Sequence, residues 1–318
     1  MKAMRIHTLG EPMVLENVAD PVPGKGEVLL RVKACGVNFA DTLMVQGKYQ
    51  EKPELPFSPG MELCGVVEDG NGTHLKPGMR VATMAGHGGF AERVAVPAMA
   101  CIPVPDGMPD PHAAAFMIAY GTSHVGLDYK AGLKSGETLL VLGAAGGVGL
   151  TAVEIGKLMG ATVIACARGT EKGEIARAAG ADHVIDSDTD AIREAVKALG
   201  GADVVYDPVG GEQFTAALRA CKPEARLLPL GFASGEIPQI PASLLLVKNL
   251  SVIGFYWGGY VKFKPQVIMS SIQTLFGWYA EGKIKPHISH ALPLAQAGEA
   301  LDLLRSRKAT GKVIVTID

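Results

Sequence analysis

A glycine-rich run, Gly143-Ala144-Ala145-Gly146-Gly147-Val148-Gly149, is the segment whose composition points most directly to chemistry. The apolar stretch Thr138–Leu142 before it is typical of a buried strand, and apolar residues from Val148 to Met159 recur at helix spacing. Glycines between a strand and a helix let the backbone approach a pyrophosphate, which the helix N–H groups attract. We therefore expect nucleotide contacts at Ala145, Gly146, Gly147 and Val148. The alternative is a tight strand–helix turn without a ligand.

The residues after the second strand of this region bear on the choice of nucleotide. An NAD site uses an Asp or Glu there to bind the ribose 2′-OH. This chain instead has Arg168, with Lys172 four residues later, and cations suit a 2′-phosphate. Glu171 and the possibility of an ordinary solvated loop argue against this interpretation. The sequence predicts NADPH as the cofactor.

Alternating strands and helices must position these residues. After the glycine run, further strands are expected at Thr162–Ala165, Val184-Ile185, Val204-Val205, Leu227–Leu230 and Leu250–Gly254, with helices at Glu171–Ala179 and around Ile192–Leu199. Such alternation builds an α/β domain with a doubly wound parallel sheet, the Rossmann arrangement.

The first hundred residues have a different pattern, with short apolar runs separated by Gly and Pro. Val28–Val32, Leu63–Val67 and Arg80–Thr83 are the clearest of these runs. They indicate an antiparallel, barrel-like domain. We expect the last strand, Lys312–Ile317, to return to this domain, which would then comprise residues 1–120 and 261–318 around a nucleotide domain of residues 121–260.

Composition excludes several classes of function. The net charge is −2 and 48% of the residues are hydrophobic, so the sequence offers no general attraction to nucleic acid or to anionic membranes. The longest apolar run, between Glu137 and Glu154, holds 16 residues and is shorter than the ~20 of a membrane-spanning helix. Five scattered cysteines without a Cys-x-x-Cys pair suit a reducing compartment, so we expect a cytoplasmic protein.

Several further motifs follow one another in a family-specific order. They are Gly36-Val37-Asn38-Phe39-Ala40-Asp41, Gln46-Gly47-Lys48-Tyr49, Pro59-Gly60-Met61-Glu62, Tyr120-Gly121-Thr122, Ala144–Gly149, Asp207-Pro208-Val209-Gly210-Gly211, Phe255–Gly258 and Thr310-Gly311-Lys312-Val313. In these motifs the chain resembles the medium-chain dehydrogenase/reductase superfamily, and within it the quinone oxidoreductase branch that includes ζ-crystallin. The resemblance spans nearly the whole chain and implies a mainly-β GroES-like domain into which the Rossmann domain is inserted.

The resemblance also bears on metal binding. Zinc-dependent alcohol dehydrogenases of this superfamily carry a cysteine where this chain has Asn38 and a histidine where it has Met61. Neither an amide nor a thioether is a good zinc ligand, and the run of four cysteines that holds a structural zinc is missing. We expect no metal.

By the resemblance, Asn38, Asp41 and Tyr49 face the nicotinamide and the substrate, so they are the candidate catalytic residues. Asn38 would donate its amide to an oxygen of cofactor or substrate. Asp41 would order the loop without transferring protons. Tyr49 would donate a hydrogen bond or a proton to the reduced acceptor, or else be a packed aromatic residue. Thr122 would contact the nicotinamide, unless its hydroxyl only caps a helix.

The remaining candidates lie at the carboxyl edge of the expected sheet and near the chain's end. Gly231 and Phe232 follow one strand, and Phe255, Tyr256 and Trp257 follow another, where they would form an apolar slot or an interface. The resemblance places Lys312 on the cofactor phosphates. Ser187 stands where relatives often have Tyr or His, which weakens the expected adenosine-side contact there.

Together these features predict an NADPH-dependent oxidoreductase that passes hydride to a quinone or related conjugated carbonyl without a metal. Such acceptors need mainly positioning and hydrogen bonds, and the cofactor supplies the hydride. The alternatives are reduction of an enone or enoyl thioester at its double bond, and an NADPH-binding protein without catalysis. A homodimer is expected through Leu250–Gly254, an otherwise exposed apolar edge.

Overall fold

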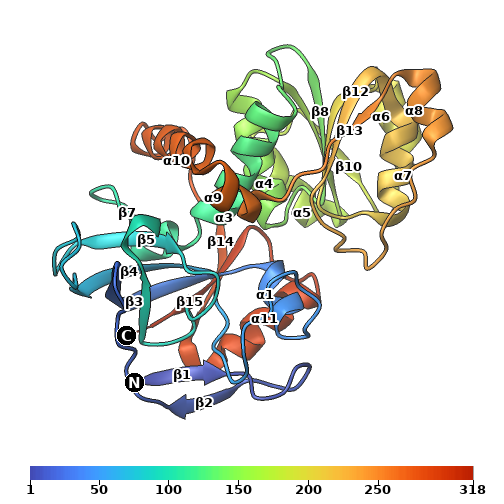
Figure 1. Ribbon diagram of the computed structural model, residues 1–318. Helices are drawn as coiled ribbons and strands as arrows, with labels where there is room; N and C mark the ends of the chain where they lie inside the picture. Colours follow the sequence, from blue (N-terminus) through green and yellow to red (C-terminus); the bar gives the residue numbers. More distant parts are fainter. Residues whose placement is uncertain (318) are drawn as a thin grey trace. The chain divides into compact units, whose positions relative to one another are not determined.

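The computed structural model describes residues 1–317, which form two compact units (Figure 1). One unit contains Met1–Ile118 and the chain from Lys285 onward, and the other is Ala119–Ile284. The first unit is therefore interrupted by the second, as expected.

Residues 261–284 differ from the expected division, because they cluster with the nucleotide unit. They contain the helix α10 (Pro265–Ala280). On this helix, the Ser271 hydroxyl lies 2.9 Å from Nδ1 of His124, and the Trp278 ring packs edge-on against the His124 ring at 5.2 Å. These side-chain contacts, which sequence spacing does not report, attach α10 to the second unit.

The first unit is built on a seven-stranded sheet with the order β14-β15-β3-β4-β5-β7, in which β6 also pairs with β3. Its strands are β3 (Glu27–Val37), β4 (Glu62–Asp69), β5 (Arg80–Met84), β6 (Arg93–Pro97), β7 (Cys101–Pro103), β14 (Ile288–Pro293) and β15 (Lys312–Thr316). A separate pair is formed by β1 (Lys2–Arg5) and β2 (Val14–Asn17), and the helices are α1 (Phe39–Met44), α2 (Asp110–Ala114) and α11 (Ala297–Arg305).

The C-terminal strand returns to this sheet, as predicted. β15 pairs antiparallel with β3 and parallel with β14, so that Val313 lies opposite Val37. The core of the unit consists of side chains from these strands and from α11, including Leu30, Leu63 and Leu301. Because each strand alternates its side chains between two faces, short runs with mixed polarity are enough to cover this core.

The second unit contains a six-stranded parallel sheet of order β10-β9-β8-β11-β12-β13, which confirms the doubly wound α/β prediction. The strands are β8 (Thr138–Leu142), β9 (Thr162–Ala167), β10 (His183–Asp186), β11 (Ala202–Asp207), β12 (Cys221–Pro229) and β13 (Ser251–Val252). The helices are α3 (Met117–His124), a π-helix (Val125–Lys130), α4 (Gly147–Leu158), α5 (Gly169–Ala178), α6 (Ile192–Ala198), α7 (Gly211–Ala220), α8 (Ala242–Lys248), α9 (Trp257–Phe263) and α10.

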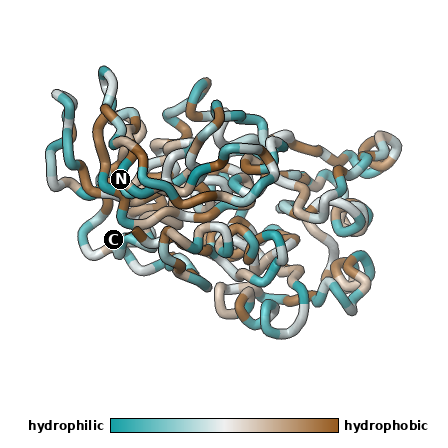
Figure 2. Tube along the Cα trace, turned by 90° about the horizontal axis from the view of Figure 1, so that it is seen from below, coloured by the Kyte–Doolittle hydropathy of each residue, from teal (hydrophilic) through white to brown (hydrophobic). Residues whose placement is uncertain are grey.

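The strand order reverses between β8 and β11, and ligands of open α/β sheets bind beside such a reversal. All five residues of β8 are buried. Figure 2 shows hydrophobic stretches of the chain alternating with hydrophilic ones along the Cα trace. The edge strand β13 is shorter than predicted, because only Ser251 and Val252 pair with β12. None of the helices within residues 1–317 has both the length and the apolar character needed to cross a membrane.

Candidate active site

The glycine-rich loop connects β8 to α4, as the sequence predicts. Gly143 has a φ of 58°, a conformation that favours glycine, and Gly146 is the N-cap of α4. A Cβ on Gly149 would collide with the Gly143 carbonyl oxygen, so a side chain has no room there. The loop therefore folds tightly under the first turn of α4, whose N–H groups lack carbonyl partners within the helix. This backbone fits the pyrophosphate of a dinucleotide.

The four predicted loop contacts differ in accessibility. Ala145 is buried, whereas Gly146, Gly147 and Val148 are half-buried and lie at the start of α4. The accessible part of the loop is therefore the one that carries the helix N–H groups.

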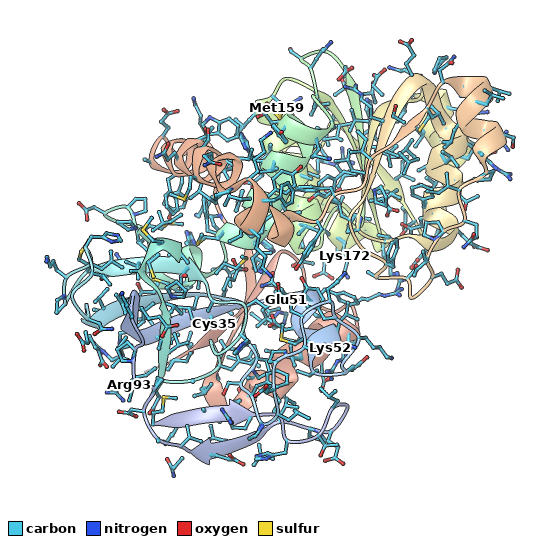
Figure 3. The ribbon with its side chains drawn as sticks, in the orientation of Figure 1. Cys35, Glu51, Lys52, Arg93, Met159 and Lys172 are labelled. Atoms are coloured by element: carbon cyan, nitrogen blue, oxygen red, sulfur yellow. The ribbon has the colours of Figure 1, made fainter. Side chains whose placement is uncertain are left out.

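A cation does occupy the end of β9, but it is paired. Arg168 is the N-cap residue of α5, and its Nε lies 3.1 Å from Oδ1 of Asp188. Both side chains are about half exposed, at 49% and 52%. Lys172, labelled in Figure 3, lies in the first turn of α5. The cations expected to bind a 2′-phosphate therefore share this surface with a carboxylate.

The end of β10 shapes the same corner of the unit. Oδ1 of Asp186 accepts hydrogen bonds from the Gly169 N–H at 2.9 Å and the Asp188 N–H at 3.0 Å. These N–H donors lower the pKa of Asp186. Ser187 donates its N–H to the Ala167 carbonyl oxygen at 2.9 Å. Asp186 thus fixes the backbone on both sides of the Arg168–Asp188 pair.

The aromatic residues at the carboxyl edge of the sheet do not form one surface. Phe232 and Tyr256 are exposed by 38% and 42%, whereas Trp257 is only 5% exposed. The Phe255 ring packs edge-on against Tyr260 at 5.7 Å. Gly231 lies two residues after the end of β12 and is half-buried. Trp257 is therefore buried and Phe255 is half-buried, whereas Phe232 and Tyr256 lie on the surface of the unit.

Thr122 does not cap a helix. It lies inside α3, which begins at Met117, and it is half-buried beside the fully buried Gly121. The capping alternative is therefore wrong, whereas the contact with a nicotinamide stays a prediction.

In the first unit, three polar side chains meet in the interior. The Lys312 ammonium donates to Oε1 of Glu62 at 2.7 Å, to Oδ1 of Asn38 at 2.7 Å and to the Val37 carbonyl oxygen at 3.1 Å. Lys312 and Glu62 are only 4% and 1% exposed. A buried ion pair requires this degree of hydrogen bonding, because each charge has lost its water.

This arrangement differs from two expectations. All three N–H bonds of the Lys312 ammonium have partners inside its own unit, so the side chain is not placed for a phosphate. The Asn38 amide group donates to Oε1 of Glu62 at 3.1 Å and to the Gly36 carbonyl oxygen at 3.3 Å. Because both of its N–H bonds are also occupied, Asn38 is not placed to donate to a ligand. Both differences have one cause: the buried Lys312 ammonium and the adjacent Asn38 amide must find their hydrogen-bond partners inside the unit.

Asp41 has the contacts that the loop-ordering interpretation requires. Its carboxylate accepts the N–H of Asn38 at 2.8 Å and the N–H of Gly60 at 3.1 Å, and the side chain is completely buried. Burial raises the pKa of Asp41 to about 7, although the two N–H donors and the nearby Lys312 act in the opposite direction. Asp41 thus ties the start of α1 to the segment before β4.

Tyr49 lies after the turn at Gly47, which has a φ of 69°. It is half-buried and packs against the hydrophobic core of the first unit. The packing of Tyr49 is therefore observed, whereas its role as a donor to the acceptor stays a prediction.

The residues that replace zinc ligands of distant relatives form no metal site. The Asn38 amide is bonded to Glu62 and Lys312, and Met61 is buried beside Glu62. The thiol of Cys35 (Figure 3) donates to the Glu62 carbonyl oxygen at 3.0 Å, and burial raises its pKa well above the ordinary value. Within residues 1–317, no three His, Cys, Asp or Glu side chains gather as metal ligands would.

Two further functional candidates, Glu62 and Asp188, are apparent only in the structure. The signal for Glu62 was available, because it is a carboxylate at the start of a predicted apolar strand and needs a buried partner. Asp188 gave no such signal, since it lies 20 residues from Arg168 in an ordinary polar turn.

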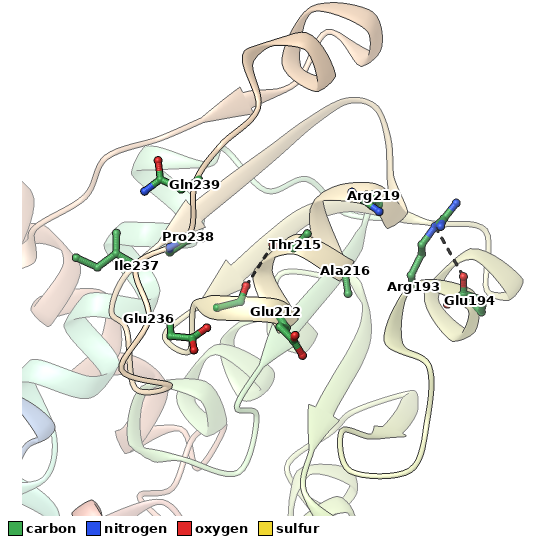
Figure 4. Close-up of a pocket in the computed structure, with 11 residues that line it drawn as sticks. Arg193, Glu194, Glu212, Thr215, Ala216, Arg219, Glu236, Ile237, Pro238 and Gln239 are labelled. Carbon is green, nitrogen blue, oxygen red and sulfur yellow. Dashed lines mark hydrogen bonds and ion pairs between the residues drawn. The ribbon is translucent and has the colours of Figure 1, made fainter.

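A surface pocket of about 530 Å³ on the second unit contains none of the predicted site residues (Figure 4). It lies beside α7 and is lined by charges of both signs, among them Arg193, Glu212, Arg219 and Glu236. Thr215 donates to the Gly211 carbonyl oxygen at 3.4 Å within its wall. The pocket gives no reason to move the candidate site away from the glycine-rich loop.

Two family models match the chain. Residues 24–106 match the alcohol dehydrogenase GroES-like domain, and residues 147–272 match a model described as zinc-binding dehydrogenase. The second description does not make this chain a zinc protein, because its segment contains no cluster of metal-ligating side chains.

Individual relatives are more specific. The chain is 42% identical to a quinone oxidoreductase-like protein 2 homolog of Nematostella vectensis, over 99% of this chain and 88% of the relative. It is 38% identical to quinone oxidoreductase-like protein 2 of Bos taurus, over 97% and 90%. The quinone oxidoreductase of Thermus thermophilus, whose structure was also solved in complex with NADPH, is 35% identical, with a TM-score of 0.89 over 99% of this chain and 100% of that one. With these family models, relatives and structures, the chain belongs to the quinone oxidoreductase family of medium-chain dehydrogenases/reductases.

Proposed function

We propose that the protein is an NADPH-dependent oxidoreductase that transfers hydride to a quinone or a related conjugated carbonyl compound. The observation that supports this most is the glycine-rich turn between β8 and α4, followed by a cation at the end of β9. Similarity to a quinone oxidoreductase solved with NADPH supports the same cofactor.

When bound, NADPH supplies the hydride. The N–H groups at the start of α4 would hold its pyrophosphate, and Arg168 with Lys172 would hold the 2′-phosphate. A 2′-phosphate would compete with Asp188 for the Arg168 guanidinium, because the two anions need the same donors. The chain's own residues thus determine which nicotinamide nucleotide binds.

The donor set of the first unit suits an acceptor that is already electron-poor. Asn38 and Met61 cannot hold zinc well, and the charges of Lys312 and Glu62 neutralise each other in the interior. A quinone or enone needs little polarisation, since positioning and hydrogen bonds to its developing oxygen charge suffice. Tyr49 is the candidate for that hydrogen bond.

Paired assays with NADPH test the proposal. We expect the purified protein to reduce a quinone with a higher kcat/KM than an enoyl thioester, and to prefer NADPH to NADH. Replacing Tyr49 with Phe should lower turnover of enones more than of quinones, because the ketone product of an enone needs a proton. Equal, negligible losses would remove the catalytic role of Tyr49.

Two other results would change the assignment. Faster reduction of an enone or enoyl thioester would make the protein a double-bond reductase. Tight NADPH binding without turnover on a broad acceptor panel would favour a non-catalytic binding protein.

We also propose a homodimer that joins two copies of the sheet at β13. This strand is the sheet edge, and the adjacent α8 exposes Leu246 by 78% and Val247 by 72%. Apolar side chains beside an open edge favour pairing with another strand. A homodimer would be supported if the wild-type protein has the molecular mass of two chains in solution and the Leu246→Lys variant has the mass of one.

The expected cytoplasmic location stays a prediction. All five cysteines are buried free thiols, which is compatible with a reducing compartment.

A further inference from the structure

One buried polar atom in the second unit has no partner. Trp257 is 5% exposed, and its indole Nε1 forms no hydrogen bond. In the part of the chain that the structure describes, the only other such side-chain atom is Nε of Arg5. Buried indole N–H groups normally find an acceptor, so a missing one needs an explanation.

The position of this indole is built into the fold. A Cβ on Gly121 would lie 2.8 Å from Cζ2 and 3.0 Å from Nε1 of Trp257, so the ring packs directly on a glycine. Gly121 precedes Thr122, the residue predicted to contact a nicotinamide. A larger residue at position 121 would displace the indole.

The surrounding topology indicates that the missing acceptor is a ligand. Trp257 begins α9 shortly after β13 ends, at the carboxyl edge of the parallel sheet. Ligands of such sheets bind at this edge. The indole is a neutral, donor-only group, so it suits a neutral oxygen acceptor better than a phosphate, for which cations and helix N–H groups are available elsewhere in the unit.

We propose that the Trp257 N–H donates a hydrogen bond to a carbonyl oxygen of the bound reactants. The inference rests on the proposed function and adds a donor to it. Two carbonyl groups have this chemistry, the carboxamide of the nicotinamide and the oxygen of the quinone or enone. In the second case the bond strengthens as hydride arrives, because charge develops on that oxygen.

The test removes the N–H while keeping the shape of the ring. Trp257 is replaced with β-(3-benzothienyl)alanine, which has sulfur in place of the N–H, and in parallel with Phe. Trp278→Phe is the matched control, since Trp278 is the only other tryptophan and lies on α10. The measurements are the Kd values of NADPH and of 2′,5′-ADP, which lacks the nicotinamide, and kcat/KM for a quinone.

Loss of one neutral hydrogen bond should change a constant by roughly threefold to tenfold. A weaker Kd for NADPH with an unchanged Kd for 2′,5′-ADP identifies the carboxamide as the acceptor. An unchanged Kd for NADPH with a lower kcat/KM identifies the substrate oxygen. The Trp278→Phe variant should leave all three constants within about twofold of wild type, well below the loss expected for one hydrogen bond.

The inference would be overturned if the benzothienyl variant kept the wild-type Kd values of NADPH and 2′,5′-ADP and the wild-type kcat/KM. It would also be overturned if the affinities for NADPH and 2′,5′-ADP fell by the same factor. Gly121→Ala provides an independent variant, because it should displace the indole and reproduce the loss seen with Trp257→Phe. Failure of the proposed function is distinguishable: wild-type protein would then bind no NADPH at all. Failure of this inference alone leaves wild-type binding and turnover intact.

Discussion

Each unit places a cation beside a carboxylate, but in opposite surroundings. The Lys312–Glu62 pair is 4% and 1% exposed and has all of its ammonium donors bonded, whereas the Arg168–Asp188 pair is 49% and 52% exposed. Desolvation makes the first pair costly to disturb. Water screens the second pair, so a competing anion can replace its carboxylate.

The comparison teaches that residue type alone does not identify a ligand contact. Sequence reasoning assigned both Lys312 and Arg168 to cofactor phosphates. Burial makes Lys312 part of the scaffold that orders Asn38 and Glu62, and exposure leaves Arg168 available to a nucleotide. Four single variants and one double variant, from the largest expected effect to the smallest, test how burial and exposure set the roles of these charged groups.

Breaking the buried pair should have the largest effect. Lys312→Met leaves the Glu62 carboxylate buried without its cation, so the free energy of unfolding should fall by about 3–5 kcal/mol. Denaturant unfolding measures this change. The control is Lys308→Met, since Lys308 is exposed in the same unit and should matter little.

The double variant Lys312→Met with Glu62→Gln sharpens this test. It should recover part of the lost stability, because the buried charge is gone. A single Lys312→Met variant as stable as the Lys308→Met control would contradict the scaffold role.

Asp41 should make stability depend on pH. Its folded pKa is raised to about 7, so between pH 4 and 7 the folded state keeps a proton that the unfolded state releases. Stability from this group is therefore present at low pH and lost as pH rises toward 7, by up to ~1.4 kcal/mol per pH unit. Asp41→Asn should become steadily more stable relative to wild type over this range. A constant difference between the unfolding free energies of Asp41→Asn and wild type at all pH values would contradict the raised pKa of Asp41.

Removing the exposed cation should affect affinity and not folding. Arg168→Gln should weaken NADPH binding by about tenfold, since a charge-assisted contact to the 2′-phosphate is lost. NADH affinity and the melting temperature should change little. Arg177→Gln, at the other end of α5, is the matched control. An equal loss for both nucleotides would place the 2′-phosphate elsewhere.

Removing the exposed carboxylate should have the smallest effect. Asp188→Asn frees the Arg168 guanidinium, so NADPH should bind about 1.5- to 5-fold more tightly, in line with the small energies of surface pairs. The gain should shrink at high salt. Weaker NADPH binding in this variant would show that Asp188 supports the site and does not compete with it.

Most of the fold could be predicted because local patterns determine it. The buried strand Thr138–Leu142 was predicted with its observed bounds, and the helix expected from the spacing between Val148 and Met159 is α4, Gly147–Leu158. The segment 261–284 could not be assigned correctly, because its place depends on contacts such as Ser271 with His124. Such contacts leave no periodic signal in the sequence.

The candidate site was predictable to a lesser extent. Glycines with a required conformation, such as Gly143, are visible in the sequence because few other residues replace them. The hydrogen bond between Asn38 and Lys312 was not visible in the sequence. The two residues are 274 positions apart and meet only when β15 pairs with β3. Trp257 looked like its exposed neighbour Tyr256 until its burial was known.

By itself, the sequence determined the α/β alternation and the dinucleotide loop, because these depend on local spacing. The absence of zinc-ligand residue types at Asn38 and Met61 followed from the family resemblance. Only the tertiary structure decided which charged groups are buried. Lys312 and Glu62 are buried, whereas Arg168 and Asp188 are exposed. The loss of water around a side chain depends on the packing of the whole chain and not on any one segment.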